Sequence, residues 1–182
     1  GELIVDLPKQ TFDLSNATAI AVGDFINEQD GNEIVAGTSL DGDVKIITMQ
    51  EGQTAEVLAE IDNTGHTAEV YAEDMDLDGN VDVLVLNNEG QASAIYYNNG
   101  QYVPLAEVNL DTAPQFAISD INQPIGLVSG GQLVDFNQDS FVDLITFSNN
   151  QLKLYTNAAG SFIDSPKLVN WGVGAIRMMR FG

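Results

Sequence analysis

Cysteine is absent from the 182-residue chain, so neither a disulfide framework nor a thiolate metal site is available. Cations are also scarce, since six Lys and Arg residues face 27 Asp and Glu residues, which gives a formal net charge of −21. Nucleic acid and anionic membrane surfaces are excluded as partners, because binding either requires clustered cations. No apolar run approaches the roughly 20 residues that a membrane-spanning helix needs, so membrane insertion is not expected. Divalent cations are the natural counter-charge, and an acidic surface that only keeps the protein soluble is the alternative.

Histidine occurs once, at His66, so any Ser-His-Asp catalytic arrangement would have to include that residue. It lies just before a predicted strand, where a turn or a packing role is more common. Without Cys or a second His, zinc and iron chemistry is not expected either. We therefore do not expect an enzyme, although the paired carboxylates of a glycoside hydrolase stay an alternative because Asp and Glu abound.

Three segments repeat one pattern: a short strand, an acidic turn, and a strand rich in β-branched residues. The acidic turns begin at Asp24, Asp74 and Asp135, which are 50 and 61 residues apart. A glycine follows each of these aspartates after 25 to 28 residues and is expected to form a turn between two further strands. These glycines are Gly52, Gly100 and Gly160. Four short strands at this period are typical of a β-propeller blade.

The predicted fold class is all-β, with blades of four antiparallel strands. The expected parts are a partial blade at 1–16, blades at 17–62, 63–108 and 128–170, an inserted loop at 109–127, and the start of a further blade at 171–182. The inserted loop is assigned to a stretch in which Pro, Gln and Asp interrupt the strand pattern. Three blades cannot close a ring of the usual four to eight. We therefore expect a segment of a larger propeller, whose open edges are covered by further blades or by another chain.

The second acidic turn carries the clearest chemical pattern. Its candidate metal ligands are Asp74, Asp76, Asp78, Asn80 and Asp82. Carboxylates at alternate positions can point at one hard cation, Gly79 permits the positive φ of a tight turn, and the residue after this glycine can offer its carbonyl. Crowded oxygen ligands favour Ca²⁺, which accepts six to eight of them in flexible geometry, over octahedral Mg²⁺. An EF-hand is excluded because Val85 stands where its bidentate Glu belongs and because strands flank the loop. An acidic turn without metal is the alternative.

The other two turns are weaker versions of this pattern. In the third turn the candidate ligands are Asp135, Asn137, Asp139 and Asp143. Ser140 replaces the glycine there, and an amide oxygen replaces one carboxylate, so weaker binding is predicted. In the first turn the candidates are Asp24, Asn27, Asp30 and Glu33. One extra residue precedes Asp30, so an empty loop is as well supported as an occupied one.

The sequence Gly-Asp-Phe at 23–25, an acidic loop, and then Glu-Ile-Val at 33–35 or Val-Asp-Val at 81–83 resembles the FG-GAP/VCBS repeat family. This family forms the blades of integrin-α-like propellers and of many bacterial secreted and surface proteins. The resemblance spans almost the whole chain apart from the inserted loop. It implies Ca²⁺ as cofactor, held by the side chains of Asp74, Asp76, Asp78 and Asp82 and by the carbonyl of Asn80. In the next blade it implies the side chains of Asp135, Asn137, Asp139 and Asp143 and the carbonyl of Phe141.

The resemblance is specific for architecture and weak for biological role, because the family serves adhesins, lectin-like modules and accessory domains of enzymes. We predict a calcium-binding adhesion, ligand-binding or scaffold module that is secreted to the extracellular space, the cell surface or the periplasm. Its partner would be a protein or a carbohydrate. The alternative is the propeller domain of a secreted polysaccharide lyase or hydrolase. Four aromatic residues could form a sugar-stacking platform, although packing between blades is their more common role; they are Tyr96, Tyr97, Tyr102 and Trp171.

Overall fold

The computed structural model describes residues 14, 16–26, 31–39, 43–48, 55–63, 65–103, 113–118, 125–159 and 161–170. Its elements are β1 (Ala17–Gly23), β2 (Glu33–Thr38), β3 (Val44–Thr48), β4 (Glu56–Ile61), β5 (His66–Glu73), β6 (Asp82–Glu89), β7 (Ala94–Val103), β8 (Ala113–Ile118), β9 (Gly130–Val134), β10 (Asp143–Ser148), β11 (Gln151–Ala158) and β12 (Ser161–Asn170). All of these are strands, so the predicted all-β class is confirmed. Within these ranges there is no helix that could span a membrane.

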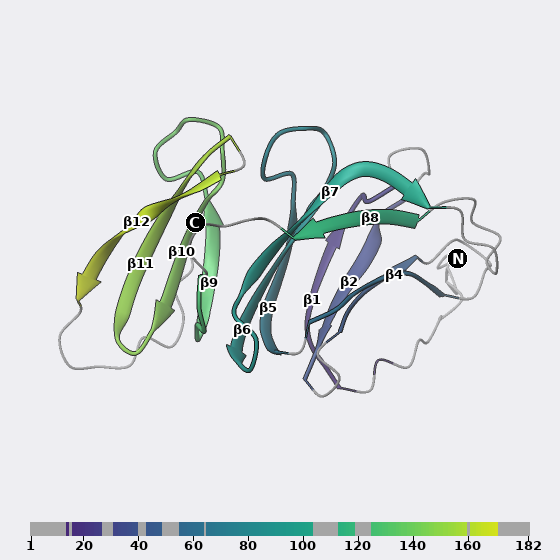
Figure 1. Cartoon of the computed structure of the whole chain (residues 1–182), viewed down its shortest axis with the longest axis horizontal. Coiled ribbons are helices and arrows are strands. Elements are labelled where there is room, and N and C mark those ends of the chain that lie inside the picture. Colours follow the sequence, from purple (N-terminus) through teal and green to yellow (C-terminus); the bar gives the residue numbers. More distant parts are fainter. Residues whose placement is uncertain are drawn as a thin grey trace, which may run out of the picture.

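The strands form three antiparallel sheets, each made of four consecutive strands (Figure 1). Their orders are β1-β2-β3-β4, β5-β6-β7-β8 and β9-β10-β11-β12. In each sheet, one of the three acidic turns joins the first strand to the second. The repetition in the sequence is therefore a repetition in structure.

The second sheet lies between the other two, which explains the unbroken apolar run in β6. Val83 and Val85 pack into a core shared with the first sheet, around Phe25. Leu84 and Leu86 point to the opposite face and pack into a second core with residues of the third sheet. A strand that is buried on both faces needs apolar residues at successive positions instead of alternating ones.

Close approach of the second and third sheets depends on a glycine in β9. A Cβ atom added at Gly131 would lie 2.7 Å from Leu86 Cδ1 and 2.9 Å from the backbone oxygen of Ile145. Beside it, the Tyr71 hydroxyl donates to the Gly131 carbonyl (2.7 Å), and Glu69 accepts from the Gly131 N–H (2.8 Å). Strands β5 and β9 are thus in direct contact, as are β1 and β5. The first strand of the second sheet, β5, therefore contacts the first strand of each neighbouring sheet, and β1 and β9 lie on opposite sides of it (Figure 1).

The prediction of a loop throughout 109–127 is wrong. Ala113–Ile118 is β8, the outer strand of the second sheet, paired with β7. Pro114 is compatible with this place because an edge strand leaves some N–H groups unpaired. The second unit consequently extends to residue 118 and does not end at 108.

The turn predicted at Gly100 is also absent. β7 continues through Gly100 to Val103, with a register shift between Asn98 and Tyr102. The glycine has a φ of 67°, so it forms an irregularity within the strand where a hairpin turn was expected. Gly52 and Gly160 lie outside the described residues, between β3 and β4 and between β11 and β12.

The three sheets remain separate, and the described strands form no closed ring. The segments predicted to belong to flanking blades, 1–16 and 171–182, lie outside the described residues, except for Leu14 and Asn16. The expectation of a segment of a larger propeller thus stays a prediction.

Candidate metal centre

The turn between β5 and β6 brings three carboxylates together. One oxygen from each of Asp74, Asp76 and Asp78 lies within 4.8 Å of the other two, so this cluster could hold a metal ion. The turn is folded back by Leu77 and Gly79, whose φ angles are 60° and 93°. Both conformations are left-handed, which supports the predicted need for glycine at the second position.

Backbone N–H groups orient these carboxylates. Asp74 accepts hydrogen bonds from the N–H groups of Asp78 (3.1 Å) and Gly79 (2.9 Å). The Asp78 N–H is shared with Asp76 (3.1 Å), and Asp78 in turn accepts from the N–H of Asn80 (2.8 Å). Each carboxylate oxygen has two lone pairs, so these bonds leave acceptor capacity for a cation.

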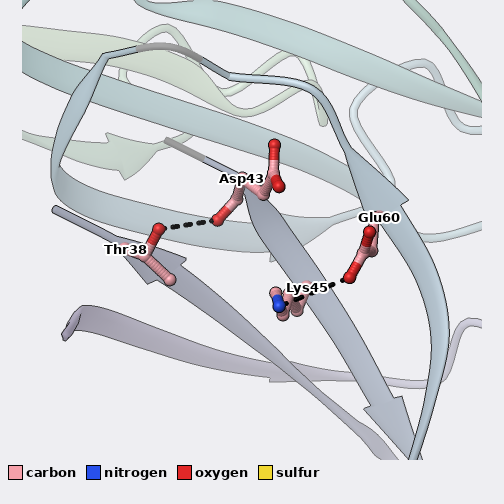
Figure 2. A network of polar contacts seen from close by, with 4 residues as sticks. All are labelled: Thr38, Asp43, Lys45 and Glu60. Carbon is pink, nitrogen blue, oxygen red and sulfur yellow. Dashed lines mark hydrogen bonds and ion pairs between the residues drawn. The ribbon is translucent and has the colours of Figure 1, made fainter. Parts of the chain in front are cut away.

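No basic side chain within the described ranges forms an ion pair with this cluster. The ion pair that these ranges do contain joins Lys45 to Glu60 at 3.3 Å across β3 and β4 of the first sheet (Figure 2). Nearby, the Thr38 hydroxyl donates to the backbone oxygen of Asp43 (3.1 Å). Among the described residues, the negative charge of the turn is thus not balanced by a basic side chain.

Asp82 follows the turn as the first residue of β6, and its side chain is fully buried. Its carboxylate accepts hydrogen bonds from the N–H groups of Met75 (2.8 Å) and Asn98 (2.9 Å). Burial raises its pKa to about 7; the two hydrogen bonds oppose this change, and the negative charges of Asp76 and Asp78 add to it. Burial also raises the pKa of Asp76; the hydrogen bond from the Asp78 N–H opposes this change, and the negative charges of Asp78 and Asp74 add to it. A cation in the turn would favour the ionised form of each of these carboxylates.

The turn between β9 and β10 repeats this arrangement. Asp135 accepts from the N–H groups of Asp139 (3.1 Å) and Ser140 (3.0 Å), as Asp74 does in the second sheet. Asn137 also accepts from the Asp139 N–H (2.9 Å), and its amide donates to the Asp139 carboxylate (2.9 Å). This turn therefore has the same hydrogen-bond pattern with one carboxylate fewer, and its weaker cation binding stays a prediction.

Asp143 takes the place of Asp82 in the third sheet. It is fully buried and accepts from the N–H groups of Phe136 (3.0 Å) and Asn157 (2.8 Å). The N–H of Phe141 donates to Asp139 (2.9 Å), so Phe141 lies in the turn as the sequence predicts. That the carbonyls of Asn80 and Phe141 bind metal stays a prediction.

In the first sheet, Glu33 replaces this buried aspartate. Its side chain is 3% exposed and accepts from the N–H of Phe25 (2.8 Å). Burial raises the pKa of Glu33, and the negative charge of Asp24 contributes in the same direction. From Asp24 to Glu33 this turn is one residue longer than from Asp74 to Asp82, and Ile26 is buried in the first core.

The first turn is only partly defined as a cation site. Asn27 and Asp30 lie outside the described residues, so convergence of all four candidates stays a prediction. One carboxylate oxygen of Asp24 is buried and has no hydrogen-bond partner in the described part of the chain.

The sequence analysis missed the asparagines that follow the second and third turns. Asn98 and Asn157 stand 16 and 14 residues after the buried aspartates and donate their N–H groups to them. Both end a Tyr-x-Asn sequence, beginning at Tyr96 and Tyr155, and this repeat was the available signal.

The predicted sugar platform is not assembled by the described aromatic residues. Tyr96 is buried in the first core, whereas Tyr97 packs against the second, on the other face of the sheet. This agrees with the packing role; the side chain of Tyr102 and all of Trp171 lie outside the described residues. His66 begins β5, and in the described ranges no hydrogen bond connects its side chain to an acid or a hydroxyl.

Ser140 occupies a left-handed conformation (φ 79°) at the place of Gly79, which makes a stability prediction possible. Ser140→Gly is expected to raise the free energy of unfolding by about 0.5–1 kcal/mol. The left-handed cost of a side chain, roughly 1–2 kcal/mol, disappears and is partly offset by the entropy of glycine in the unfolded chain. Gly79→Ser should do the reverse, although an added Cβ would contact nothing within 4 Å. Urea unfolding without calcium measures both.

A matched control is Ser129→Gly, because Ser129 is exposed and does not have a positive φ. This variant should be slightly destabilised by glycine entropy alone. If Ser140→Gly is destabilised to the same extent, the proposed backbone strain at residue 140 does not exist.

The sequence matches no protein-family model and no curated protein.

Proposed function

We propose that the chain is a calcium-binding segment of an FG-GAP/VCBS-type β-propeller. The convergence of Asp74, Asp76 and Asp78 in one turn carries this proposal. Two further facts support it: the described residues provide no basic partner for the cluster, and the turn at Asp135 has the same hydrogen-bond pattern.

The donor set fits Ca²⁺ in particular. All candidate ligands are oxygen atoms, whereas zinc sites in proteins are built mostly from His nitrogen and Cys sulfur. Three carboxylates and a carbonyl on a single short turn supply ligands from one side, and water completes the shell of an ion with flexible geometry. Asp74, Asp76 and Asp78 would hold the ion, and Asp82 would fix the base of the turn through Met75.

The propeller arrangement is supported by the sheets themselves. Each is a four-stranded antiparallel unit, and the first strands β1, β5 and β9 adjoin, as the inner strands of neighbouring blades do. In this arrangement the outer faces of the first and third sheets would be covered by further blades or by another chain.

As a biological role we propose an extracellular, cell-surface or periplasmic module for adhesion, ligand binding or scaffolding, with a protein or carbohydrate partner. Calcium concentrations outside cells suit turns of modest affinity. The second candidate is the propeller of a polysaccharide lyase or hydrolase. A carbohydrate array separates them: binding without product release favours the module, and release of oligosaccharide favours the enzyme.

Calcium titration tests the proposal. Isothermal titration of metal-free protein is expected to show at least two Ca²⁺ sites, the tighter at Asp74–Asp78, with Mg²⁺ binding far more weakly. Asp76→Ala should remove the tighter site. Asp62→Ala changes the same charge at an exposed position outside the turns and should leave both sites intact. A titration with no saturable Ca²⁺ binding would refute the proposal.

A further inference from the structure

The turns of the second and third sheets are joined by one side chain. The Asn157 amide nitrogen donates a hydrogen bond of 2.7 Å to the backbone oxygen of Met75, across 82 residues of sequence. Asn157 is 1% exposed and Met75 is 0% exposed, so water does not compete for this bond. Met75 belongs to the acidic turn of the second sheet, whereas Asn157 lies in β11 of the third.

Both residues also bind the buried carboxylate of their own turn. The N–H of Met75 donates to Asp82 (2.8 Å), and the N–H of Asn157 donates to Asp143 (2.8 Å). A continuous path of hydrogen bonds and two residues therefore connects the closing carboxylate of one turn to that of the other. In a dry interior such a network is strong and tolerates little independent movement of its members.

We propose that the two turns bind Ca²⁺ with positive cooperativity, and that Asn157 is the positioning residue that couples them. This inference rests on the calcium binding proposed above. An ion in the second turn fixes the backbone around Met75, which holds the Asn157 side chain in place. Asp143 and the third turn are then already ordered, so the second ion has less conformational freedom to remove. By linkage, an ion in the third turn must favour binding in the second turn by the same factor.

The first and second sheets provide an internal contrast. Asn98 has the position of Asn157 and donates its N–H to Asp82 in the same way. Its amide nitrogen, however, is buried and has no hydrogen-bond partner among the described residues. Phe25 corresponds to Met75 in the first turn, because its N–H donates to the buried carboxylate of Glu33, and this turn is one residue longer than the second. We therefore assign coupling to the second and third turns only.

Calorimetric titration with Ca²⁺ measures the coupling, with Asp24→Ala present throughout to silence the first turn. Adding Asp76→Ala removes the calcium site of the second turn, so only the third turn binds. Adding Asp139→Ala instead removes the site of the third turn, so only the second turn binds. The product of the two stepwise association constants of the two-site protein is expected to exceed the product of the single-site constants by about fivefold to tenfold. A ratio of one overturns the coupling and leaves the proposed calcium binding intact. Absence of binding in every protein overturns both.

The variant Asn157→Ala then tests whether the hydrogen bond from Asn157 to Met75 couples the two turns. It keeps the backbone N–H that Asp143 accepts but removes the amide donor to Met75, so the ratio should fall to about one while both sites still bind. Asn98→Ala is the matched control and should keep the full ratio. If Asn157→Ala keeps it as well, Asn157 is not the coupling residue. Should Asn157→Ala fail to fold, the single-turn comparison still decides whether the sites are coupled.

Discussion

Removal of Ca²⁺ is expected to lower the melting temperature of the protein by about 10–20 °C. An ion that binds only the folded turn stabilises by about 2.7 kcal/mol at a hundredfold excess over its Kd. For a chain of this size, each kcal/mol corresponds to about 2–4 °C, and two sites act together. Without the ion, the carboxylates of Asp74, Asp76 and Asp78 also repel one another at short range. Calorimetric melting with and without chelator measures the difference.

Single substitutions in each turn show how much that turn contributes to the fall in melting temperature on calcium removal. Asp76→Ala should abolish more than half of this fall. Asp139→Ala should abolish a smaller part of it, and Asp30→Ala the smallest part. Added Ca²⁺ is expected to restore the melting temperature, whereas Mg²⁺ should restore it poorly. Asp62→Ala should respond to chelator like the unaltered protein. A melting curve that is indifferent to chelator would contradict calcium binding and would leave the acidic turns without a physical explanation.

Asp82→Ala is expected to cost about 2–6 kcal/mol even without calcium. The substitution leaves the buried N–H groups of Met75 and Asn98 without their acceptor, and each unpaired group costs roughly 1–3 kcal/mol. Urea unfolding in chelator measures the loss. The control is Asp78→Ala, an exposed carboxylate of the same turn that accepts hydrogen bonds from Asn80. Equal losses in the two variants would contradict the structural role of Asp82.

The raised pKa of Asp82 also predicts a pH dependence. In the calcium-free protein its pKa is about 7, against an ordinary value of 3.8, so between these pH values the folded state holds a proton that the unfolded state has released. Stability from this group is present in full below pH 4 and is lost as the pH rises through 7. Unfolding at pH 5 and pH 7.5 should show this decline, which should be smaller in Asp82→Asn. An equal decline in both proteins would exclude Asp82 as its cause.

The acidic turns could be predicted because their information is local. Alternate carboxylates followed by Gly79 specify both the acidic cluster and the left-handed backbone within nine residues. β8 could not be predicted in this way, since Ala113–Ile118 becomes a strand only through pairing with β7 across a connection of nine residues. The glycine at position 100 was misleading because the same φ > 0 preference serves a hairpin turn and an irregular strand.

Contacts between sheets could not be predicted from the sequence for another reason. The bond from Asn157 to Met75 depends on how two units stack, and no local pattern specifies that distance. Glu33 was predicted as a ligand of the first turn, whereas its described contact is with the Phe25 N–H. The repeat identified the equivalent positions, and only the fold shows which atoms meet.

A crystal structure of the protein grown in excess Ca²⁺, with anomalous diffraction data, tests the central claim most directly. We predict an ion within about 2.3–2.6 Å of oxygens from Asp74, Asp76 and Asp78. A second ion is predicted among Asp135, Asn137 and Asp139. A turn at Asp74–Asp78 that carries no anomalous peak at saturating Ca²⁺ would contradict the account.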